Sequence, residues 1–254
     1  LGAEATVEGG NIHLKARYGL QGGEVNMSGK YGTTVLGTDN VLMAAAIAKG
    51  TTVIKGAACE PEVVDLADFL NSMGAKITGA GTATITVEGV TELSGTEHVV
   101  IPDRIEAGTF MVAGALASES ALKVNRINPK HLELITKVLR ESGYQVDETA
   151  DSLTVHRNPN GTGANIVTSP YPGFPTDMQA QMCALFATTE GESVVKDTIF
   201  PQRFMHLSEM KRMGADFEFD EGTAVIRGVE QLSGAPVMAS DLRASAALVL
   251  AGLN

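Results

Sequence analysis

The chain repeats one unit of about 70 residues, and this repeat constrains the fold more than any other feature of the sequence. Two stretches show it most clearly: 89–95 (GVTELSG) and 228–234 (GVEQLSG). Each follows a helical pattern that ends in Met-Gly-Ala. Weaker copies place the same glycine elsewhere, so that Gly2, Gly74, Gly143 and Gly214 are separated by 72, 69 and 71 residues. A period this long makes each copy a small folding unit rather than one turn of a common solenoid.

The second copy shows the order of elements within a unit. A β-branched run at 52–55 predicts a strand, and Pro61 suits the first turn of a following helix. The apolar residues of that helix recur every three or four positions and define one face: Val63, Leu66, Ala67, Leu70 and Met73. Gly74 then fits the left-handed residue that commonly ends a helix.

Further strands and a second helix complete this copy. The alternation at 84–87 predicts a half-buried strand, and 99–101 predicts the next one. Asp103 stands where an N-cap is needed for a helix that runs to Leu116. We assume the same capping role for Asp39. The other copies predict strands at 122–124 and 194–196, and helices at 41–48, 131–141, 178–187, 204–213 and 244–253.

The resulting unit has a βαβαββ pattern with two helices. Strands and helices in rotation favour an α/β fold over a β-sandwich. Units of this kind can each bury one helix in a shared centre and keep their sheets outside. The stretch 158–163 resembles a turn between strands rather than a linker between domains.

The overall charge limits the classes of partner. The 254 residues carry a formal net charge of −11, which disfavours general binding to nucleic acid or to a membrane surface. A few arginines can still create a local site for a small anion. No apolar run reaches the length of a membrane span, and no leader argues for export. Both ends of the chain fall inside repeats, so we expect a fragment of a longer protein.

The cysteines and histidines predict no covalent or metal framework. Two cysteines are too few for a set of disulfides. Cys183 lies in an apolar run and predicts a buried small side chain. Cys59 lies in a loop before a Glu-Pro pair, which leaves a reactive thiol open as an alternative. The sequence has no Cys/His cluster with metal-ligand spacing, and we expect no cofactor.

The segment 170–181 (PYPGFPTDMQAQ) is the most specific stretch for chemistry. Three prolines stiffen the approach to an apolar helix that opens with Thr176 and Asp177. The helix dipole favours an anionic side chain there, and a fixed carboxylate can accept a proton from a ligand hydroxyl. The alternative is that Asp177 is a plain helix cap, as we assume for Asp39 and Asp103.

Two arginines and a helix N-terminus extend the list of candidate sites. Arg203 and Arg243 lie in early turns of predicted helices, where the helix dipole does not stabilise a positive charge. A carboxylate or phosphate partner would explain why arginines stand at these positions. Simple solvation is the alternative. His206, between apolar neighbours, predicts a satisfied structural histidine. The stretch 33–39 leads into a helix N-terminus that can hold a phosphate, although it lacks P-loop spacing.

Five stretches together resemble the UDP-N-acetylglucosamine 1-carboxyvinyltransferase family, also called UDP-N-acetylglucosamine enolpyruvyl transferases. They occur in the family's order and spacing over nearly the whole chain: 60–65 (EPEVVD), 101–109 (IPDRIEAGT), 174–181 (FPTDMQAQ), 203–206 (RFMH) and 241–245 (DLRAS). The third stretch argues strongly against the related shikimate-pathway enolpyruvyl transferase.

The resemblance implies a fold of two inside-out α/β barrels, each built from three βαβαββ units. Residues 1–101 would then form the C-terminal part of one barrel, and residues 102–254 most of the second. It also implies a cytoplasmic enzyme of peptidoglycan synthesis, which transfers enolpyruvate from phosphoenolpyruvate to the 3-hydroxyl of UDP-N-acetylglucosamine and releases phosphate. No cofactor, nucleic acid or membrane partner is implied.

The same resemblance implies roles for individual residues. Asp177 takes the position of the carboxylate that deprotonates the sugar hydroxyl. Arg203 and Arg243 match arginines near the anionic reactants, and Ile199 matches a position that contacts the nucleotide sugar. The loop beside the UDP diphosphate is matched by Gly32, Thr33, Thr34 and Val35.

Two departures from the family pattern bear on activity. Leu36 replaces a glycine of the family's diphosphate loop, although the hydroxyl of Thr34 is kept. The family's Lys-Asn pair, its mobile loop with a Cys or Asp general acid, and a late arginine lie outside this chain. We therefore expect the chain alone to be inactive. A non-catalytic homologue that binds a nucleotide sugar or a protein partner is the alternative.

Overall fold

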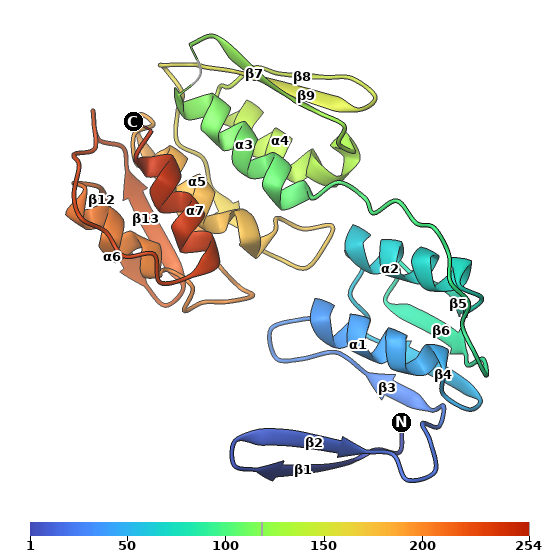
Figure 1. Ribbon diagram of the computed structural model, residues 1–254. Coiled ribbons are helices and arrows are strands. Elements are labelled where there is room, and N and C mark those ends of the chain that lie inside the picture. Colours follow the sequence, from blue (N-terminus) through green and yellow to red (C-terminus); the bar gives the residue numbers. More distant parts are fainter. Residues whose placement is uncertain (118, 254) are drawn as a thin grey trace. The chain divides into compact units, whose positions relative to one another are not determined.

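A computed structural model describes residues 1–117 and 119–253, in which strands and helices alternate as the repeat predicts (Figure 1). The chain forms two units. Unit 1 comprises Leu1–Ile101 with Pro170–Pro172, and unit 2 comprises Pro102–Ser169 with the chain from Gly173 onward. Ser118 and Asn254, which fall within the expected second barrel, lie outside the described residues.

Unit 1 contains a hairpin, a mixed sheet and two helices. Its elements are β1 (Glu4–Glu8), β2 (Asn11–Lys15), β3 (Glu24–Asn26), α1 (Val35–Ala46), β4 (Thr51–Lys55), α2 (Pro61–Ser72), β5 (Lys76–Thr78) and β6 (Thr84–Glu88). Strands β1 and β2 pair with each other, and the rest form a sheet of order β3-β4-β6-β5. Helices α1 and α2 pack together over this sheet, and their core includes Leu42, Val63 and Leu70.

Unit 2 surrounds one helix with two others and two sheets. Its elements are α3 (Arg104–Ala117), β7 (Ala121–Asn125), the 3-10 helix η1 (Pro129–Leu132), α4 (Glu133–Glu141), β8 (Val146–Glu148), β9 (Ser152–His156), β10 (Ile166–Val167), the 3-10 helix η2 (Thr176–Met178), α5 (Gln179–Phe186), β11 (Glu192–Lys196), α6 (Met205–Arg212), β12 (Asp216–Asp220), β13 (Thr223–Arg227) and α7 (Leu242–Ala251).

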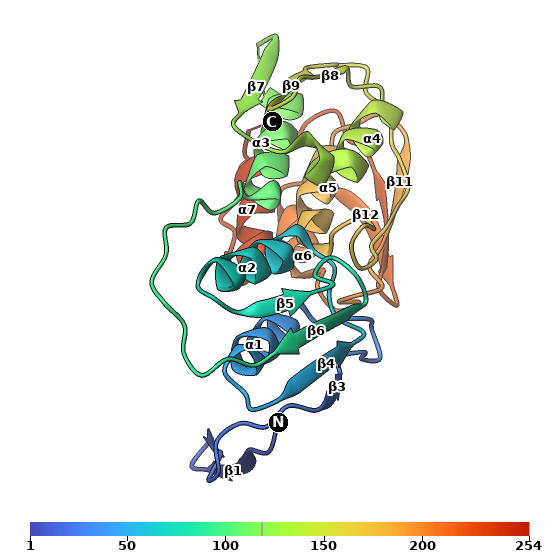
Figure 2. The same ribbon diagram turned by 90° about the vertical axis from the view of Figure 1, so that its right-hand side faces the viewer.

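Helix α5 lies at the centre of unit 2, because all of its residues are buried. Helices α3 and α7 pack against it and against each other, and the sheets lie outside these helices (Figures 1 and 2). One helix of this unit, α5, is therefore fully buried, while α3 and α7 each keep an exposed side, with Phe110 52% and Val249 69% exposed. Among the described residues, no helix combines the length and apolar character that a bilayer crossing needs.

The two four-stranded sheets show the repeat in three dimensions. Their orders, β3-β4-β6-β5 and β10-β11-β13-β12, correspond strand by strand. In each, the first strand is parallel to the second, and the remaining pairs are antiparallel. The third sheet, β7-β9-β8, lacks the parallel edge strand. The predicted mixed α/β class is confirmed, and the matching strand orders of these two sheets are consistent with the predicted repeat.

The prediction of a strand at 99–101 is wrong. In the two four-stranded sheets, the edge strand comes just before a helix: β3 before α1, and β10 before η2 and α5. The stretch 99–101 comes before α3 in the same way, so it takes the place of the edge strand that is missing beside β7. Within the described residues it pairs with no strand, and Val99 is 91% exposed. It forms the last residues of unit 1 before the boundary at Pro102, and β-branched residues alone do not make a strand without a partner.

The assumed cap at Asp39 is also wrong, because α1 begins six residues earlier than predicted. Thr34 is its N-cap, and the Thr34 hydroxyl accepts a hydrogen bond from the N–H of Gly37 at 3.2 Å. Asp39 lies inside the helix, where burial, followed by the charges of Glu62 and Glu60, raises its pKa. The cap at Asp103 is confirmed, since its Oδ1 accepts from the N–H groups of the residues two and three positions later at 2.7 and 3.0 Å.

The repeated GVxxLSG motif closes the end of a helix. Ser94 donates through its N–H and its hydroxyl to the carbonyl of Met73, at 2.8 and 3.1 Å. Ser233 donates in the same way to Met213, at 2.7 and 3.2 Å. These carbonyls stand at the ends of α2 and α6, where a helix leaves carbonyls without intrahelical partners. The residue after each methionine is a glycine in the left-handed region: Gly74 has a φ of +104°, as predicted, and Gly214 has a φ of +93°.

The first glycine of the motif has no room for a side chain. A Cβ on Gly228 would collide with the backbone of Thr189, just as one on Gly89 would collide with Ala48. Gly228→Ala should therefore lower the free energy of unfolding by about 1–3 kcal/mol, through overpacking against backbone that cannot move aside. Denaturant unfolding measures this change.

Gly234→Ala, at the end of the same motif, is the matched control. A Cβ there meets no atom within 4 Å, so the free energy of unfolding should change by no more than about 0.5 kcal/mol. Equal effects of the two substitutions would contradict the packing explanation.

Candidate active site

Three of the predicted site residues meet in unit 2. Oδ1 of Asp177 accepts a hydrogen bond from Nη1 of Arg203 at 2.9 Å and another from Nε of Arg243 at 3.0 Å. Asp177 lies in η2, Arg203 in the turn before α6, and Arg243 in the first turn of α7. The three side chains are 35%, 20% and 25% exposed, so the cluster is partly shielded and still open to a ligand.

Asp177 does not act as a helix cap. Helix η2 begins after Pro175 and α5 after Met178, and neither start has a side-chain capping hydrogen bond. The carboxylate faces the two guanidinium groups instead. Both contacts fall on Oδ1, and no hydrogen bond within the described part of the chain reaches Oδ2. Oδ2 can therefore accept a hydrogen bond or a proton from a ligand.

Asp241 adds a second carboxylate to the cluster. It caps α7 through hydrogen bonds from the N–H groups of Arg243 at 2.9 Å and Ala244 at 3.0 Å, and it lies 3.9 Å from Nε of Arg203. Burial favours a higher pKa for Asp241, but those two N–H groups and then Arg203 hold the pKa below its ordinary value. Positive and negative groups thus alternate around Asp177.

Arg203 differs from the prediction in its local setting. It precedes α6 by two residues rather than occupying its first turn, and its N–H donates to the carbonyl of Phe200 at 2.9 Å. Its guanidinium lies over the Phe200 ring, 5.6 Å from the centroid. The turn, the ring and the two carboxylates together fix this guanidinium.

His206 is buried but not fully hydrogen-bonded. It is 1% exposed, and its Nε2 has no partner among the described residues, so the prediction of a satisfied histidine is wrong for this atom. Burial lowers the pKa of His206 to about 4, against the opposing charge of Asp241. The ring is therefore neutral near pH 7.

Ile199 belongs to the same unit. It is half-buried in the loop between β11 and α6, and its N–H donates to Oδ1 of Asp197 at 2.9 Å. Sequence reasoning missed Asp197, which is 2% exposed and directly follows β11. The available signal was a carboxylate directly after a predicted apolar strand, because a buried aspartate needs several hydrogen-bond donors.

The other predicted residues belong to unit 1 and lead into α1. Gly29 and Gly32 exchange two backbone hydrogen bonds of 2.7 and 3.2 Å, and this turn brings Thr33, Thr34 and Val35 to the helix N-terminus. The first N–H groups of a helix lack intrahelical partners and attract anions. Leu36, which departs from the family pattern, is 75% exposed.

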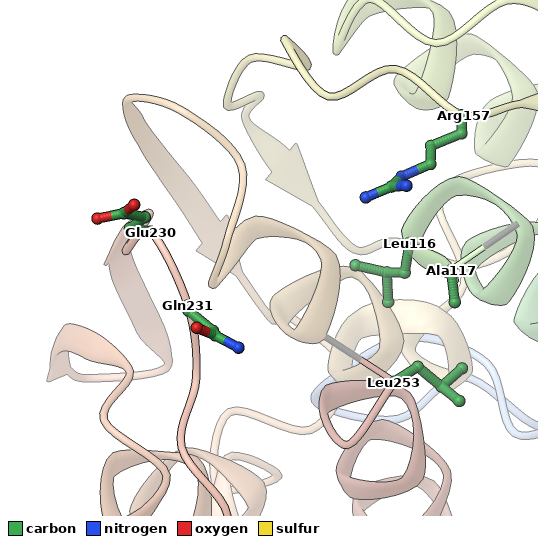
Figure 3. Close-up of a pocket in the computed structure, with 6 residues that line it drawn as sticks. All are labelled: Leu116, Ala117, Arg157, Glu230, Gln231 and Leu253. Atoms are coloured by element: carbon green, nitrogen blue, oxygen red, sulfur yellow. The ribbon is translucent and has the colours of Figure 1, made fainter. Parts of the chain in front are cut away.

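A separate cavity of about 420 Å³ lies at the other end of the helices of unit 2. Figure 3 shows its lining residues, Leu116, Ala117, Arg157, Glu230, Gln231 and Leu253. It adjoins the C-terminal ends of α3 and α7, whereas Arg243 lies at the N-terminal end of α7. None of the predicted site residues lines this cavity.

The cysteines do not contribute a reactive group. Cys183 is fully buried, as predicted, and burial raises the pKa of its thiol. Cys59 is half-buried, and burial followed by the charge of Glu60 raises its pKa as well, which disfavours the reactive thiolate considered as an alternative. The described residues contain no His/Cys/Asp/Glu group that could hold a metal ion.

Comparison with known proteins gives one family over the full chain. Residues 1–254 match the family model of EPSP synthase (3-phosphoshikimate 1-carboxyvinyltransferase). The chain is 61% identical over 256 residues to the UDP-N-acetylglucosamine 1-carboxyvinyltransferase of Akkermansia muciniphila. It is 53% identical over 253 residues to the protein of the same name from Methylacidiphilum infernorum. The resemblance noted in the sequence is thereby confirmed.

These matches cover the whole chain but only 60% of the length of each of the two relatives. Among solved structures, the enolpyruvyl transferase NikO of Streptomyces tendae is similar with a TM-score of 0.86 and 24% identity, over 99% of this chain and 62% of that one. The EPSP synthase of Acinetobacter baumannii has a TM-score of 0.63 at 21% identity, over 99% and 61% of the two chains. The chain therefore has an enolpyruvyl transferase fold.

The buried neutral state of His206 should make stability depend on pH. The unfolded histidine takes up a proton below about pH 6.5, but the folded one does so only near pH 4, so stability is full above pH 6.5 and is lost as pH falls through this window. Between pH 7 and pH 5 the free energy of unfolding should fall by about 2 kcal/mol from this residue.

His206→Phe removes the titrating group and keeps an aromatic ring against Phe204. Urea unfolding at pH 7 and pH 5 should show a smaller loss of stability in this variant than in the unaltered protein. His13→Gln, in the exposed strand β2, is the control and should keep the full loss. The same pH dependence in His206→Phe and the unaltered protein would refute the assignment.

Proposed function

The chain belongs to the EPSP synthase (3-phosphoshikimate 1-carboxyvinyltransferase) family, and from that premise we propose that it is part of an enolpyruvyl transferase for UDP-N-acetylglucosamine. The observation that carries the proposal is the Asp177 carboxylate, held by Arg203 and Arg243 with its second oxygen left for a ligand. The high identity to UDP-N-acetylglucosamine 1-carboxyvinyltransferases, rather than to the shikimate enzyme that gives the family its name, supports the choice of substrate.

The proposed reaction joins the sugar to phosphoenolpyruvate and releases phosphate. The 3-hydroxyl of the sugar loses its proton to Oδ2 of Asp177, and its oxygen bonds to C2 of phosphoenolpyruvate. C3 gains a proton from the Cys or Asp general acid that the family resemblance places in a loop outside this chain. Loss of a proton from C3 and of phosphate from C2 then restores the double bond. Removal of the hydroxyl proton by a carboxylate at hydrogen-bond distance is general base catalysis.

Arg203 and Arg243 have two tasks in this proposal. They hold Oδ1 of Asp177 from two directions, which fixes where Oδ2 meets the sugar hydroxyl. They also place fixed positive charge beside the anionic phosphate and carboxylate of phosphoenolpyruvate. Guanidinium groups that are already held in place stabilise charge without reorganising during the reaction.

The remaining residues would bind the nucleotide sugar. Ile199 offers a half-buried apolar side chain in the loop beside Arg203. Gly32, Thr33, Thr34 and Val35 would place hydroxyl and N–H groups of the α1 N-terminus beside the UDP diphosphate.

The two units would be parts of two inside-out α/β barrels. Unit 1 supplies one sheet with α1 and α2, and unit 2 supplies two sheets around α3, α5 and α7. Separate apolar cores, one with Leu70 and the other with Leu248, support this division.

Asp177→Asn in the full-length protein tests the function. The amide oxygen can still accept both guanidinium hydrogen bonds, so the melting temperature should change little, but the basic carboxylate is lost. We expect kcat for phosphate release from phosphoenolpyruvate in the presence of UDP-N-acetylglucosamine to fall by roughly two to four powers of ten. Affinity for the nucleotide sugar should change much less.

Glu192→Gln is the matched control, because it neutralises an exposed carboxylate on β11 that pairs with surface Arg227, away from the Asp177 cluster. It should leave kcat unchanged. A full-length Asp177→Asn enzyme with near-normal kcat would remove the catalytic role of Asp177. A full-length protein that binds the nucleotide sugar but never releases phosphate would instead favour the non-catalytic homologue.

A further inference from the structure

Asp197 is a buried carboxylate that has no part in the proposed proton transfer. It is 2% exposed, and its two oxygens accept hydrogen bonds from four donors. Oδ1 accepts from the Thr168 hydroxyl at 2.8 Å and from the N–H groups of Ile199 at 2.9 Å and Phe200 at 2.8 Å. Oδ2 accepts from the Thr176 hydroxyl at 2.6 Å. This many donors is what a buried carboxylate needs to offset its lost hydration.

The donors come from both sides of the Asp177 cluster. Thr176 directly precedes Asp177 in the chain. Ile199 and Phe200 begin the turn that carries Arg203, whose own N–H donates to the Phe200 carbonyl at 2.9 Å. The Asp197 carboxylate therefore joins the segment that bears the candidate base to the segment that bears one of its arginines.

Thr168, at the end of β10, also forms hydrogen bonds to the turn that follows Asp197. The N–H of Thr198 donates to the Thr168 hydroxyl at 3.0 Å, and the Thr198 hydroxyl donates to the Thr168 carbonyl at 2.6 Å. Because Thr168 also bonds to Asp197, the turn is held to the sheet along its side chains and backbone. The Asp197 carboxylate is thus held at the ends of β10 and β11 as well as by the segments that it connects.

The bond to Thr176 distinguishes Asp197 from an ordinary turn-forming aspartate. Hydrogen bonds from the N–H groups two and three residues later are the local pattern by which aspartates form turns. Thr176, by contrast, is 21 residues away and immediately next to Asp177. At 2.6 Å, this hydroxyl–carboxyl hydrogen bond belongs to the short class.

We propose that Asp197 is a positioning residue, which sets the distance between Asp177 and Arg203 by holding the Thr176 hydroxyl on one oxygen and the Ile199–Phe200 backbone on the other. The proposal rests on the proposed function, because it concerns the geometry of the same site. A displacement of about 1 Å at a reacting group can cost about a hundredfold in rate, so the bond between Thr176 and Asp197 matters for turnover through the geometry that it sets.

Thr176→Val in the full-length enzyme removes the hydroxyl and nearly keeps the shape. We expect kcat to fall by about a hundredfold, with a much smaller change in the KM for the nucleotide sugar, since the bonds to Ile199 and Phe200 remain. Thr176→Ser keeps the hydroxyl and should retain kcat. A Thr176→Val enzyme with the kcat of the Thr176→Ser enzyme would overturn the proposal.

A double-variant cycle tests whether Thr176 acts through Asp197. Asp197→Asn keeps one oxygen for the turn but replaces the charged acceptor of Thr176 with an amide group, so kcat should fall by about tenfold. Combining it with Thr176→Val should lower kcat no further than Thr176→Val alone. Losses that multiply would mean that the two residues act independently, and the proposal would fail.

Ser193→Ala provides the control for stability alone. Ser193 lies on β11, the strand that Asp197 follows, and is 1% exposed. Its hydroxyl accepts a hydrogen bond from the N–H of Ala164 at 3.2 Å, outside the Asp177 cluster. This variant should lower the melting temperature and leave kcat unchanged. If Ser193→Ala lowers kcat as much as Thr176→Val does, the effect is structural and the positioning role is refuted.

A crystal structure of the Thr176→Val variant separates this proposal from the proposed function. The positioning role predicts a longer distance between Asp177 Oδ1 and Arg203 Nη1 than the 2.9 Å described here. An unchanged distance refutes positioning even if the enzyme is an enolpyruvyl transferase. An unaltered full-length protein without transferase activity refutes the proposed function, and the distance measurement still decides the role of Asp197.

Discussion

The burial of α5 on every side is the constraint on which unit 2 depends. A helix without a solvent-facing side can be accommodated only where its neighbours approach closely, and small residues on facing helices, such as Ala184 and Ala247, permit this. The chain that enters α5 must come from the surface, and Asp177 stands in that entry. Polar chemistry is thus confined to one end of an otherwise apolar centre.

The same packing brings together the first turns of two helices. Asp177 precedes α5, and Asp241 caps α7, which packs along α5. Helix N-termini carry partial positive charge, and Arg203 and Arg243 add two full charges at the same end. In a chain with a net charge of −11, these groups offset the charges of Asp177 and Asp241 at one end of unit 2 and would supply the donors that the proposed anionic reactants need.

Sequence reasoning succeeded mostly where the determinants are local and failed mostly where distant segments meet; the cap assumed at Asp39 is a local prediction that failed, because Thr34 caps α1 instead. The amphipathic face of α2, the left-handed Gly74 and the cap at Asp103 depend on neighbours within a few positions. The strand expected at 99–101 needs a partner strand, and within the described residues it has none. The partners of Asp177 arrive from 26 and 66 residues away, so the residue pattern around Asp177 could not distinguish it from a cap. Local sequence patterns likewise could not predict the four donors around Asp197. The resemblance to a family implied roles for residues but did not predict which residues contact one another.

The GVxxLSG motif has a consequence for how such a protein could grow. In each copy, a serine of the motif donates hydrogen bonds to the carbonyl at the end of that copy's own helix, α2 or α6. A duplicated stretch of gene would therefore encode both the helix and the serine that hydrogen-bonds to its end. New copies would not have to wait for complementary changes in the older ones, so selection could act on the ends of the central helices while the rest of each copy stayed as it was.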